Sequence, residues 1–90
     1  MLKKKAGKEK GLYVFVPAYN EEKTLGKVLQ DLVALKKKGL IRGILVVNDG
    51  STDKTRKIAE SFRSEGVEVI NHKRNMGKGF CFYEAALWAK

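Results

Sequence analysis

The stretch that decides the fold is Ile44-Leu-Val-Val-Asn-Asp-Gly-Ser-Thr-Asp-Lys-Thr55, in which four apolar residues run directly into a polar turn. An uninterrupted apolar run is typical of a strand buried on both faces, as in a parallel sheet with helices above and below. After the turn, Ile58, Ala59 and Phe62 follow at helical spacing, so the strand leads into a helix. Because open α/β sheets bind ligands at the carboxyl ends of their strands, residues 48–53 are candidates for a binding site.

The same pattern of strand, polar loop and helix precedes this stretch. A short apolar strand, Leu12-Tyr-Val-Phe-Val16, ends at Pro17, because proline cannot donate to a central ladder. Asn20 is the expected N-cap of the following helix, with Glu21 and Glu22 in its first turn. The apolar positions of this amphipathic helix recur every three or four residues: Leu25, Val28, Leu29, Leu32 and Leu35.

The second half of the chain continues the alternation. Ser51 or Thr52 is the expected cap of the second helix. A shorter third strand over residues 67–71 precedes a basic loop, residues 72–79, and a last helix that begins at about Gly79. The order β-α-β-α-β-α predicts an α/β fold, with a three-layer, Rossmann-like parallel sheet and right-handed crossovers.

Composition and charge indicate a small, basic globular protein. Ninety residues suit one domain, and a net charge of +9 predicts attraction to anions. Residues 1–10 contain five lysines and one glutamate, so we expect a basic flexible tail there and the domain over residues 11–90. Cys81 is the only cysteine, which excludes an internal disulfide, and no apolar stretch is long enough for a signal peptide or a membrane span. These features predict a cytoplasmic protein, with peripheral association at a membrane as the alternative.

The last helix is more apolar than a surface helix should be. Between Phe80 and Ala89 only Glu84 is charged, and a helix that is apolar on nearly all sides is normally buried on all sides. Ninety residues can hardly supply that cover, so we expect an exposed apolar surface and self-association. Either a homo-oligomer or a missing C-terminal half of a larger fold would cover this surface.

Each predicted strand ends in a polar loop that has a structural and a functional interpretation. Asp49 is expected to be an exposed carboxylate that accepts hydrogen bonds from a base or ribose, although its loop also fits a simple capped turn. In Pro17-Ala-Tyr-Asn-Glu21, Tyr19 can pack on a ring and Glu21 can hold a ribose, or the loop only ends a strand and caps a helix. The loop over residues 73–79 offers three cations and two glycines to a diphosphate, or is simply solvated.

Two further residues near these loops are interpreted as structural. His72 has no second His or Cys and no carboxylate cluster at metal-ligand spacing, and Cys81 lies in an apolar helix. The first strand is not followed by G-x-G-x-x-G, and no glycine-rich loop ends in Gly-Lys-Ser/Thr, which argues against a dinucleotide dehydrogenase and a P-loop NTPase. Each loop is a weak signal alone, but one at each strand end predicts a common site.

Three motifs together resemble the N-terminal nucleotide-binding part of family 2 glycosyltransferases with the GT-A fold. They are Val16-Pro-Ala-Tyr-Asn-Glu-Glu22, Val47-Asn-Asp-Gly-Ser-Thr-Asp53 and Asn75-Met-Gly-Lys-Gly79, which match family motifs in order and spacing. Within the family the pattern looks most like the dolichyl- or polyprenyl-phosphate hexosyltransferases. The resemblance implies a partial GT-A fold, a UDP- or GDP-sugar as donor and a polyprenyl phosphate as acceptor.

The resemblance also implies the residues of a nucleotide site. The base would be contacted by Asp49, the ribose would be held by Glu21, and the diphosphate or base would lie near the start of the last helix. The complete implied set of nucleotide-binding residues is Pro17, Ala18, Tyr19, Glu21, Asp49, Lys78 and Gly79.

The family resemblance further implies inverting hexosyl transfer with Mg²⁺ or Mn²⁺ held by an Asp-X-Asp motif and with a later acidic general base. This chain has no Asp after Asp53, so neither motif is present. The reaction needs the cation to neutralise the departing diphosphate and the base to deprotonate the acceptor. We therefore expect the chain to contain no catalytic or metal-binding residues and not to turn over by itself.

Two other functions compete with this interpretation. A non-catalytic basic module would use the charge of +9 to bind nucleic acid or an anionic membrane. Tyr13, Phe15 and Phe62 fit core positions and not a stacking platform among cations, which disfavours nucleic acid as a partner. A purely structural assembly unit would use the apolar last helix.

Overall fold

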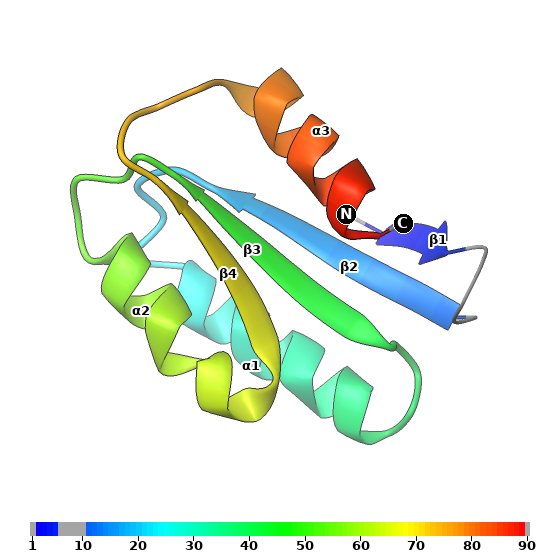
Figure 1. Ribbon diagram of the computed structural model, residues 1–90. Helices are drawn as coiled ribbons and strands as arrows, with labels where there is room; N and C mark the ends of the chain where they lie inside the picture. The colour runs from blue at the N-terminus through cyan, green and yellow to red at the C-terminus, as the bar shows by residue number, and fades with distance from the viewer. Residues whose placement is uncertain (1, 6–10, 90) are drawn as a thin grey trace.

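The computed structural model describes residues 2–5 and 11–89 and contains a single four-stranded sheet (Figure 1). Its strands lie in the order β1 (Leu2–Lys5), β2 (Gly11–Ala18), β3 (Gly43–Asp49) and β4 (Val67–His72). The strands β2, β3 and β4 are parallel, whereas β1 pairs antiparallel with β2. The predicted parallel sheet is therefore confirmed, with one edge strand in addition.

The extra strand differs from the expectation of a flexible tail. Residues 2–5 pair with residues 11–14 of β2, in the register Leu2 with Val14 and Lys5 with Gly11. The edge of β2 would otherwise present unpaired backbone N–H and C=O groups, which a further strand satisfies. The remainder of the predicted tail, residues 6–10, lies outside the described residues.

The helices complete three layers. Helices α1 (Leu25–Lys37) and α2 (Thr55–Ser61) cover one face of the sheet, and α3 (Lys78–Trp88) covers the other (Figure 1). A short 3₁₀ turn, η1 (Arg63–Glu65), connects α2 to β4. The order of β2, α1, β3, α2, β4 and α3 matches the predicted alternation. No helix in the described part of the chain is long and apolar enough to cross a bilayer.

The central strand β3 is buried along its whole length, because helices pack on both of its faces. Its side chains alternate between two cores, as the pleat of a strand requires. Ile44 and Val46 belong to the core under α1 and α2, whereas Leu45 and Val47 belong to the core under α3. The prediction of a strand buried on both faces is confirmed.

Helix α3 buries only a narrow part of its surface. Cys81 and Ala85 face the sheet and are at most 5% exposed. Large apolar side chains on its other sides are exposed: Phe80, Phe82, Tyr83 and Leu87. The predicted exposed apolar surface is present, and self-association through it stays a prediction.

The starts of the first two helices differ from the sequence prediction. Helix α1 is preceded by Thr24 and α2 by Lys54, neither with a side-chain cap. Asn20 lies well before α1 with a backbone φ of 53°, in the left-handed region that Asn tolerates. The residues expected as caps, Asn20, Ser51 and Thr52, are used instead to bond one loop to another.

Candidate functional site

The carboxyl ends of the three parallel strands meet at one edge of the sheet. Ala18 at the end of β2 pairs with Asn48, and Asp49 at the end of β3 pairs with His72 at the end of β4. The loops that follow these strands enclose a cavity of about 260 Å³. It is lined by Pro17, Ala18, Tyr19, Glu21, Asp49, Asn75, Gly77, Lys78 and Cys81.

This cavity brings together six of the seven residues that the sequence suggested for nucleotide binding. Pro17, Ala18, Tyr19 and Glu21 come from the end of β2 and its loop, Asp49 from β3, and Lys78 from the start of α3. Gly79 lies in the first turn of α3 and is not a lining residue. Three residues outside the predicted set also line the cavity: Asn75, Gly77 and Cys81.

Hydrogen bonds join the loop after β2 to the loop after β3. The N–H of Asn20 donates to Ser51 Oγ at 2.9 Å, and Asn20 Oδ1 accepts the N–H of Thr52 at 2.8 Å. The N–H of Glu21 donates to Oγ1 of the buried Thr55 at 2.8 Å. Since Tyr19 and Glu21 flank Asn20, these bonds fix two cavity-lining residues relative to β3.

At Gly50, the loop after β3 comes close to the backbone of the loop after β4. Its φ is +76°, a conformation that residues with a Cβ adopt at a cost. A Cβ at this position would lie 2.2 Å from the carbonyl carbon of Arg74 and 2.4 Å from the nitrogen of Asn75. Only glycine therefore allows the backbone of residues 74–75 to close the cavity beside Asp49.

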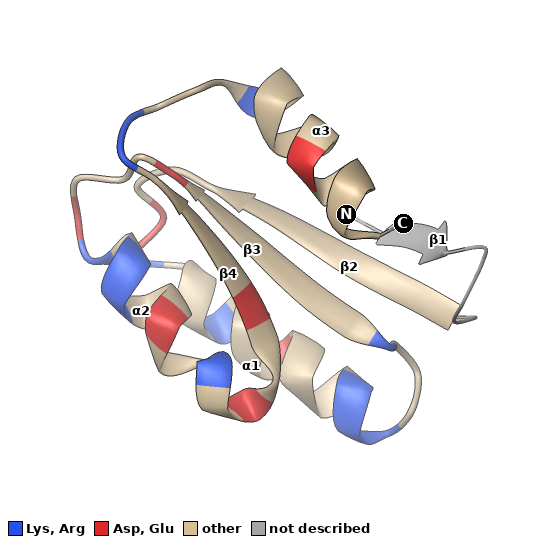
Figure 2. Ribbon diagram, viewed as in Figure 1, with Lys and Arg blue, Asp and Glu red and all other residues tan. Residues whose placement is uncertain are grey.

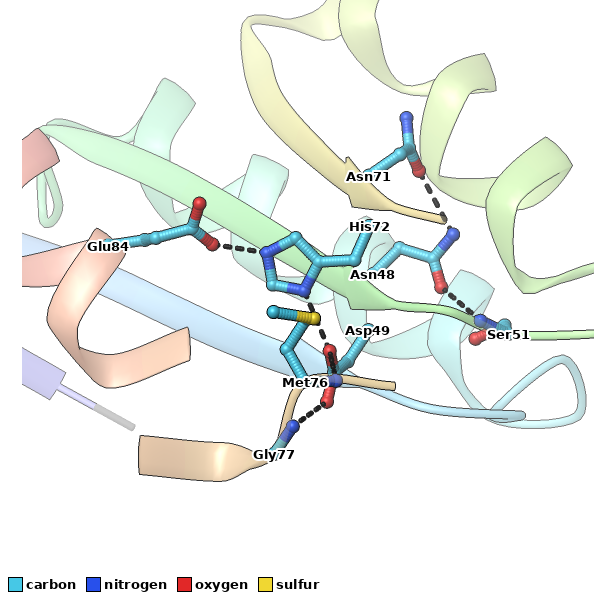
Figure 3. Close-up of polar contacts among 8 residues, drawn as sticks. All are labelled: Asn48, Asp49, Ser51, Asn71, His72, Met76, Gly77 and Glu84. Carbon is cyan, nitrogen blue, oxygen red and sulfur yellow. Dashed lines mark hydrogen bonds and ion pairs between the residues drawn. The ribbon is translucent and has the colours of Figure 1, made fainter. Parts of the chain in front are cut away.

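Asn48 supports this turn from within the core. It is 2% exposed, and its Oδ1 accepts the N–H of Ser51 at 3.3 Å while its Nδ2 donates to Asn71 Oδ1 at 2.9 Å (Figure 3). Asn71 donates in turn to Glu60 on α2 at 2.7 Å. The side chain of Asn48 thus accepts a backbone hydrogen bond of the turn, and Asn48 is not a lining residue of the cavity.

Asp49 is buried, with 5% of its surface exposed, and not the exposed carboxylate that the sequence suggested. Its Oδ1 lies 2.7 Å from His72 Nδ1 and accepts the Met76 N–H at 2.8 Å, and its Oδ2 accepts the Gly77 N–H at 3.0 Å (Figure 3). Burial alone would raise the pKa of Asp49, but these hydrogen bonds and the charge of His72 together lower it below its usual value. The cavity therefore contains an ionised carboxylate.

His72 lies between two carboxylates, which corrects the interpretation of this residue as lacking nearby acids. Its Nδ1 faces Asp49 from β3, and its Nε2 contacts Oε1 of Glu84 from α3 (Figure 3). Burial alone would lower the pKa of His72, but the hydrogen bonds and charges of both acids raise it above its usual value. Only the doubly protonated ring can donate to both acids, so the pair stabilises the imidazolium.

Cys81 lies in the core under α3, as expected. It is 1% exposed, and burial, followed by the charge of Asp49, a hydrogen bond to Asp49 and the charge of Glu84, raises the pKa of Cys81 to about 11. The side chain therefore remains a thiol near neutral pH. A thiol in this state is neither a nucleophile nor a good metal ligand.

Asp49, His72 and Cys81 place three metal-binding atom types within 4.8 Å of one another. They do not fit Mg²⁺ or Mn²⁺, because such cations prefer oxygen ligands and this group offers a protonated thiol and an imidazole held as a donor. Both nitrogens of His72 are already bonded to acids. This group is held together by hydrogen bonds, and its ligand types do not suit Mg²⁺ or Mn²⁺.

Comparisons with known proteins identify relatives of this chain. A family model described as glycosyl transferase family 2 matches residues 13–90. A dolichyl-phosphate beta-glucosyltransferase of Trichomonas vaginalis is 40% identical over 76 residues, which cover 76% of this chain and 24% of that protein. An uncharacterized protein of Methanocaldococcus jannaschii is 48% identical over 68 residues, covering 76% of this chain and 25% of that protein.

A solved structure also resembles this chain. The crystal structure of S. aureus TarS 1-349 superposes with a TM-score of 0.72 at 32% identity, covering 87% of this chain and 24% of that one. The chain thus spans about a quarter of the length of these relatives.

Proposed function

The chain belongs to glycosyl transferase family 2, and we propose that it forms the nucleotide-binding part of a glycosyltransferase that uses a UDP- or GDP-sugar. The observation that carries the proposal is the meeting of Tyr19, Asp49 and Lys78 in one cavity, although they follow three different strands. Carboxyl ends of parallel strands are where α/β proteins bind nucleotides. A volume of about 260 Å³ suits a nucleoside rather than a whole nucleotide sugar.

Each lining residue has chemistry that fits one part of a nucleoside diphosphate. The ionised Asp49 accepts an N–H of the base, and the half-exposed ring of Tyr19 packs against it. Glu21 accepts ribose hydroxyls. Lys78 and the free N–H groups at the start of α3 attract the diphosphate, with Gly79 leaving that approach open.

The charge around the cavity supports an anionic ligand. Lys73 and Arg74 precede Lys78 in the loop between β4 and α3, where Figure 2 shows cations at both ends of the loop. Lys78 lines the cavity, where α3 presents its positive N-terminal end, whereas Lys73 and Arg74 are not lining residues. These two residues add positive charge to the loop that leads to Lys78, which favours an anionic ligand near it.

The cation and the general base of an inverting hexosyl transfer have no fitting residues in the described part of the chain. We infer that both groups are supplied by residues other than these, so the 90-residue chain binds nucleotide without turning over. A polyprenyl phosphate as acceptor would bring the assembled enzyme to a membrane surface. The exposed side of α3 would then be covered by the remainder of the enzyme or by a second copy.

A nucleotide titration tests the proposal. Amide NMR of the 90-residue chain, with UDP, GDP and their sugars added to millimolar concentration, should show shifts at Tyr19, Asp49 and Gly77. Manganese should not change the affinity, because the described residues lack a fitting site. An absence of shifts at these amides would reject the proposal.

Matched charge variants separate a built site from general attraction to a basic protein. Lys78→Gln should weaken UDP binding several-fold, because one cation at the diphosphate is lost. Lys27→Gln removes the same charge from the outer side of α1, where Lys27 pairs with Asp31, and should leave the affinity unchanged. Equal losses in both variants would indicate non-specific attraction.

The net charge of +9 favours a second candidate, a basic module for nucleic acid or anionic lipid. Tyr13 and Phe15 pack edge-to-face against Trp88 and Phe82, so these rings do not form a platform for bases. Binding of this kind should fall more steeply with salt than binding in the cavity, because a polyanion contacts many more cations than one diphosphate does. Titration with single-stranded RNA at two salt concentrations distinguishes the two functions.

A further inference from the structure

The carboxylate of Asp49 has little hydrogen-bonding capacity left for a ligand. An ionised carboxylate has about four acceptor positions, two on each oxygen. His72 and Met76 occupy both positions on Oδ1, and Gly77 occupies one on Oδ2, among the residues that the structure describes. The Cys81 thiol also hydrogen-bonds to the carboxylate, but a thiol is only a weak donor. Asp49 therefore offers the cavity one acceptor position that no strong donor fills, on Oδ2.

Glu84 determines that His72 is a donor toward Asp49. A neutral imidazole has one N–H and could leave Nδ1 without a proton. With carboxylates on both sides, the ring keeps both protons, and its side chain is only 8% exposed. The titratable groups that face the ring are Asp49 from β3 and Glu84 and Cys81 from α3, and the neighbouring ring of Phe80 does not titrate. The contact with Glu84 also fixes the direction of the ring.

We propose that His72, held by Glu84, is a positioning residue that leaves Asp49 a single acceptor position without a strong donor and thereby selects uracil over guanine. The inference rests on the proposed binding of a nucleoside diphosphate and narrows the donor to a uridine diphosphate sugar. It adds two residues, one on β4 and one on α3, to the determinants of the site.

The donor patterns of the bases explain the selection. Uracil presents one ring N–H, which matches one acceptor. Guanine presents two neighbouring N–H groups, which a carboxylate accepts with both oxygens, as it does from a guanidinium. Oδ1 of Asp49 is already filled, so one guanine donor would remain unpaired. Cytosine has an acceptor, N3, where uracil has its ring N–H. Its amino donor on N4 can reach Oδ2 only with N3 held beside the carboxylate, where the two acceptors repel.

A comparison of three diphosphates tests the selectivity directly. Calorimetric titration of the 90-residue chain with UDP, GDP and CDP keeps the diphosphate and ribose constant. We expect UDP to bind about tenfold more tightly than the other two, the typical effect of one unpaired buried donor or acceptor. Equal affinities would overturn the selection but leave nucleotide binding intact, whereas no binding of any diphosphate would reject the proposed function itself.

Two substitutions at His72 test whether this residue sets the preference for UDP over GDP. His72→Phe keeps the ring and removes the donor, so Oδ1 of Asp49 gains a free position and the ratio of UDP to GDP affinity should fall toward one. His72→Asn places an amide nitrogen near the position of Nδ1 and should retain most of the preference. An unchanged ratio in the Phe variant would overturn the role of His72.

Glu84→Gln keeps the shape of the side chain and gives a test that does not depend on the Phe variant folding. Nitrogen NMR of His72 should show that the ring loses its second proton at a lower pH than in the natural chain, with a parallel fall in the UDP to GDP ratio. Glu65→Gln is the control, since Glu65 also pairs with a cation, Lys37, but lies in η1, away from the cavity. If Glu84→Gln changes neither the titration of His72 nor the ratio, the positioning role is wrong.

Discussion

The two faces of the sheet bury different kinds of side chain. Under α1 and α2 lies a large apolar core that includes Leu29, Ile44 and Val46, all fully buried. Under α3 the apolar core is smaller and includes Leu45 and Val47 from the same central strand. The strand β3 therefore contributes equally to both cores. The cores differ in size because two helices pack on one face and only α3 packs on the other.

The smaller core lies next to the polar cluster of Asp49, His72 and Glu84. Burying these groups costs desolvation, and their mutual hydrogen bonds and opposite charges offset that cost, as the pKa shifts of Asp49 and His72 indicate. Such a cluster contributes less to stability than a large apolar core, but it sets the acceptor that the cavity presents. The comparison teaches that the larger apolar core lies under α1 and α2, whereas the buried charged groups beside the cavity lie on the side of α3.

The largest expected effect tests the first half of this comparison. Leu29→Ala removes a side chain with no exposed surface from the core under α1. We expect a loss of roughly 2–5 kcal/mol in the free energy of unfolding, because the lost burial and the cavity add together. Urea denaturation followed by circular dichroism measures it.

Leu40→Ala is the control for this variant. The same atoms are removed from a side chain that is 60% exposed, so a change of about 0.5 kcal/mol or less is expected. Similar losses in the two variants would contradict a stability concentrated under α1.

The second prediction concerns the turn after β3, where Gly50 lies against the loop between β4 and α3. Gly50→Ala adds a Cβ that overlaps the backbone of Arg74 and Asn75, in addition to the strain of a positive φ. We expect a loss of about 2–3 kcal/mol in stability and a loss of nucleotide binding, since the loop beside Asp49 must move.

Gly39→Ala separates strain from overlap. Gly39 has a φ of +78°, close to that of Gly50, but an added Cβ would meet no atom within 4 Å. Gly39→Ala should lower the free energy of unfolding by about 1 kcal/mol, through backbone strain only, and leave nucleotide binding unchanged. If both variants lose binding equally, the close approach at Gly50 is not what forms the cavity.

The third prediction uses pH to change the contribution of the Asp49–His72 pair, on the α3 side of the sheet, to the stability of the fold. The pKa of His72 is raised in the folded protein, so its contribution is complete below about pH 6.5 and is lost as the pH rises through the folded value. The pKa of Asp49 is lowered, so its contribution is complete above about pH 3.9 and is lost as the pH falls through the folded value. The pair stabilises the fold most between these limits.

Urea midpoints at pH 5.5 and pH 9 measure this dependence. The natural chain should lose stability between the two, and His72→Phe should lose less, because its ring does not titrate. The difference between the two proteins isolates His72 from other titrating groups. Parallel losses would show that the charge of His72 contributes nothing to the fold.

Much of the fold was predictable because its signals are local. The uninterrupted apolar residues of 44–47 indicate a strand covered on both faces, and the polar residues after each strand mark the edge where ligands bind. Parallel pairing then brings Tyr19, Asp49 and Lys78 together without any further information.

The rest depended on contacts between distant parts of the chain. Glu84 reaches His72 only because α3 packs across β2 and β3 on the face of the sheet where His72 lies, and no spacing in the sequence reveals this contact. Asn20 looks like a helix cap, but the loop after β3 competes for its side chain and N–H group. The strand β1 was missed because lysines are depleted in strands, whereas an unpaired sheet edge accepts them.

The smallest effect on stability is expected on the outer side of α3. Leu87 is 51% exposed, and Leu87→Lys keeps a good helix former, so the free energy of unfolding should change by about 0.5 kcal/mol or less. The same change puts a charge into the exposed apolar surface of Phe80, Tyr83 and Leu87, and should reduce self-association at high concentration. Light scattering over a concentration series, beside urea denaturation, measures both. A large loss of stability together with unchanged association would mean that contacts of the outer side of α3 stabilise the fold. That result would contradict a stability concentrated under α1 and α2.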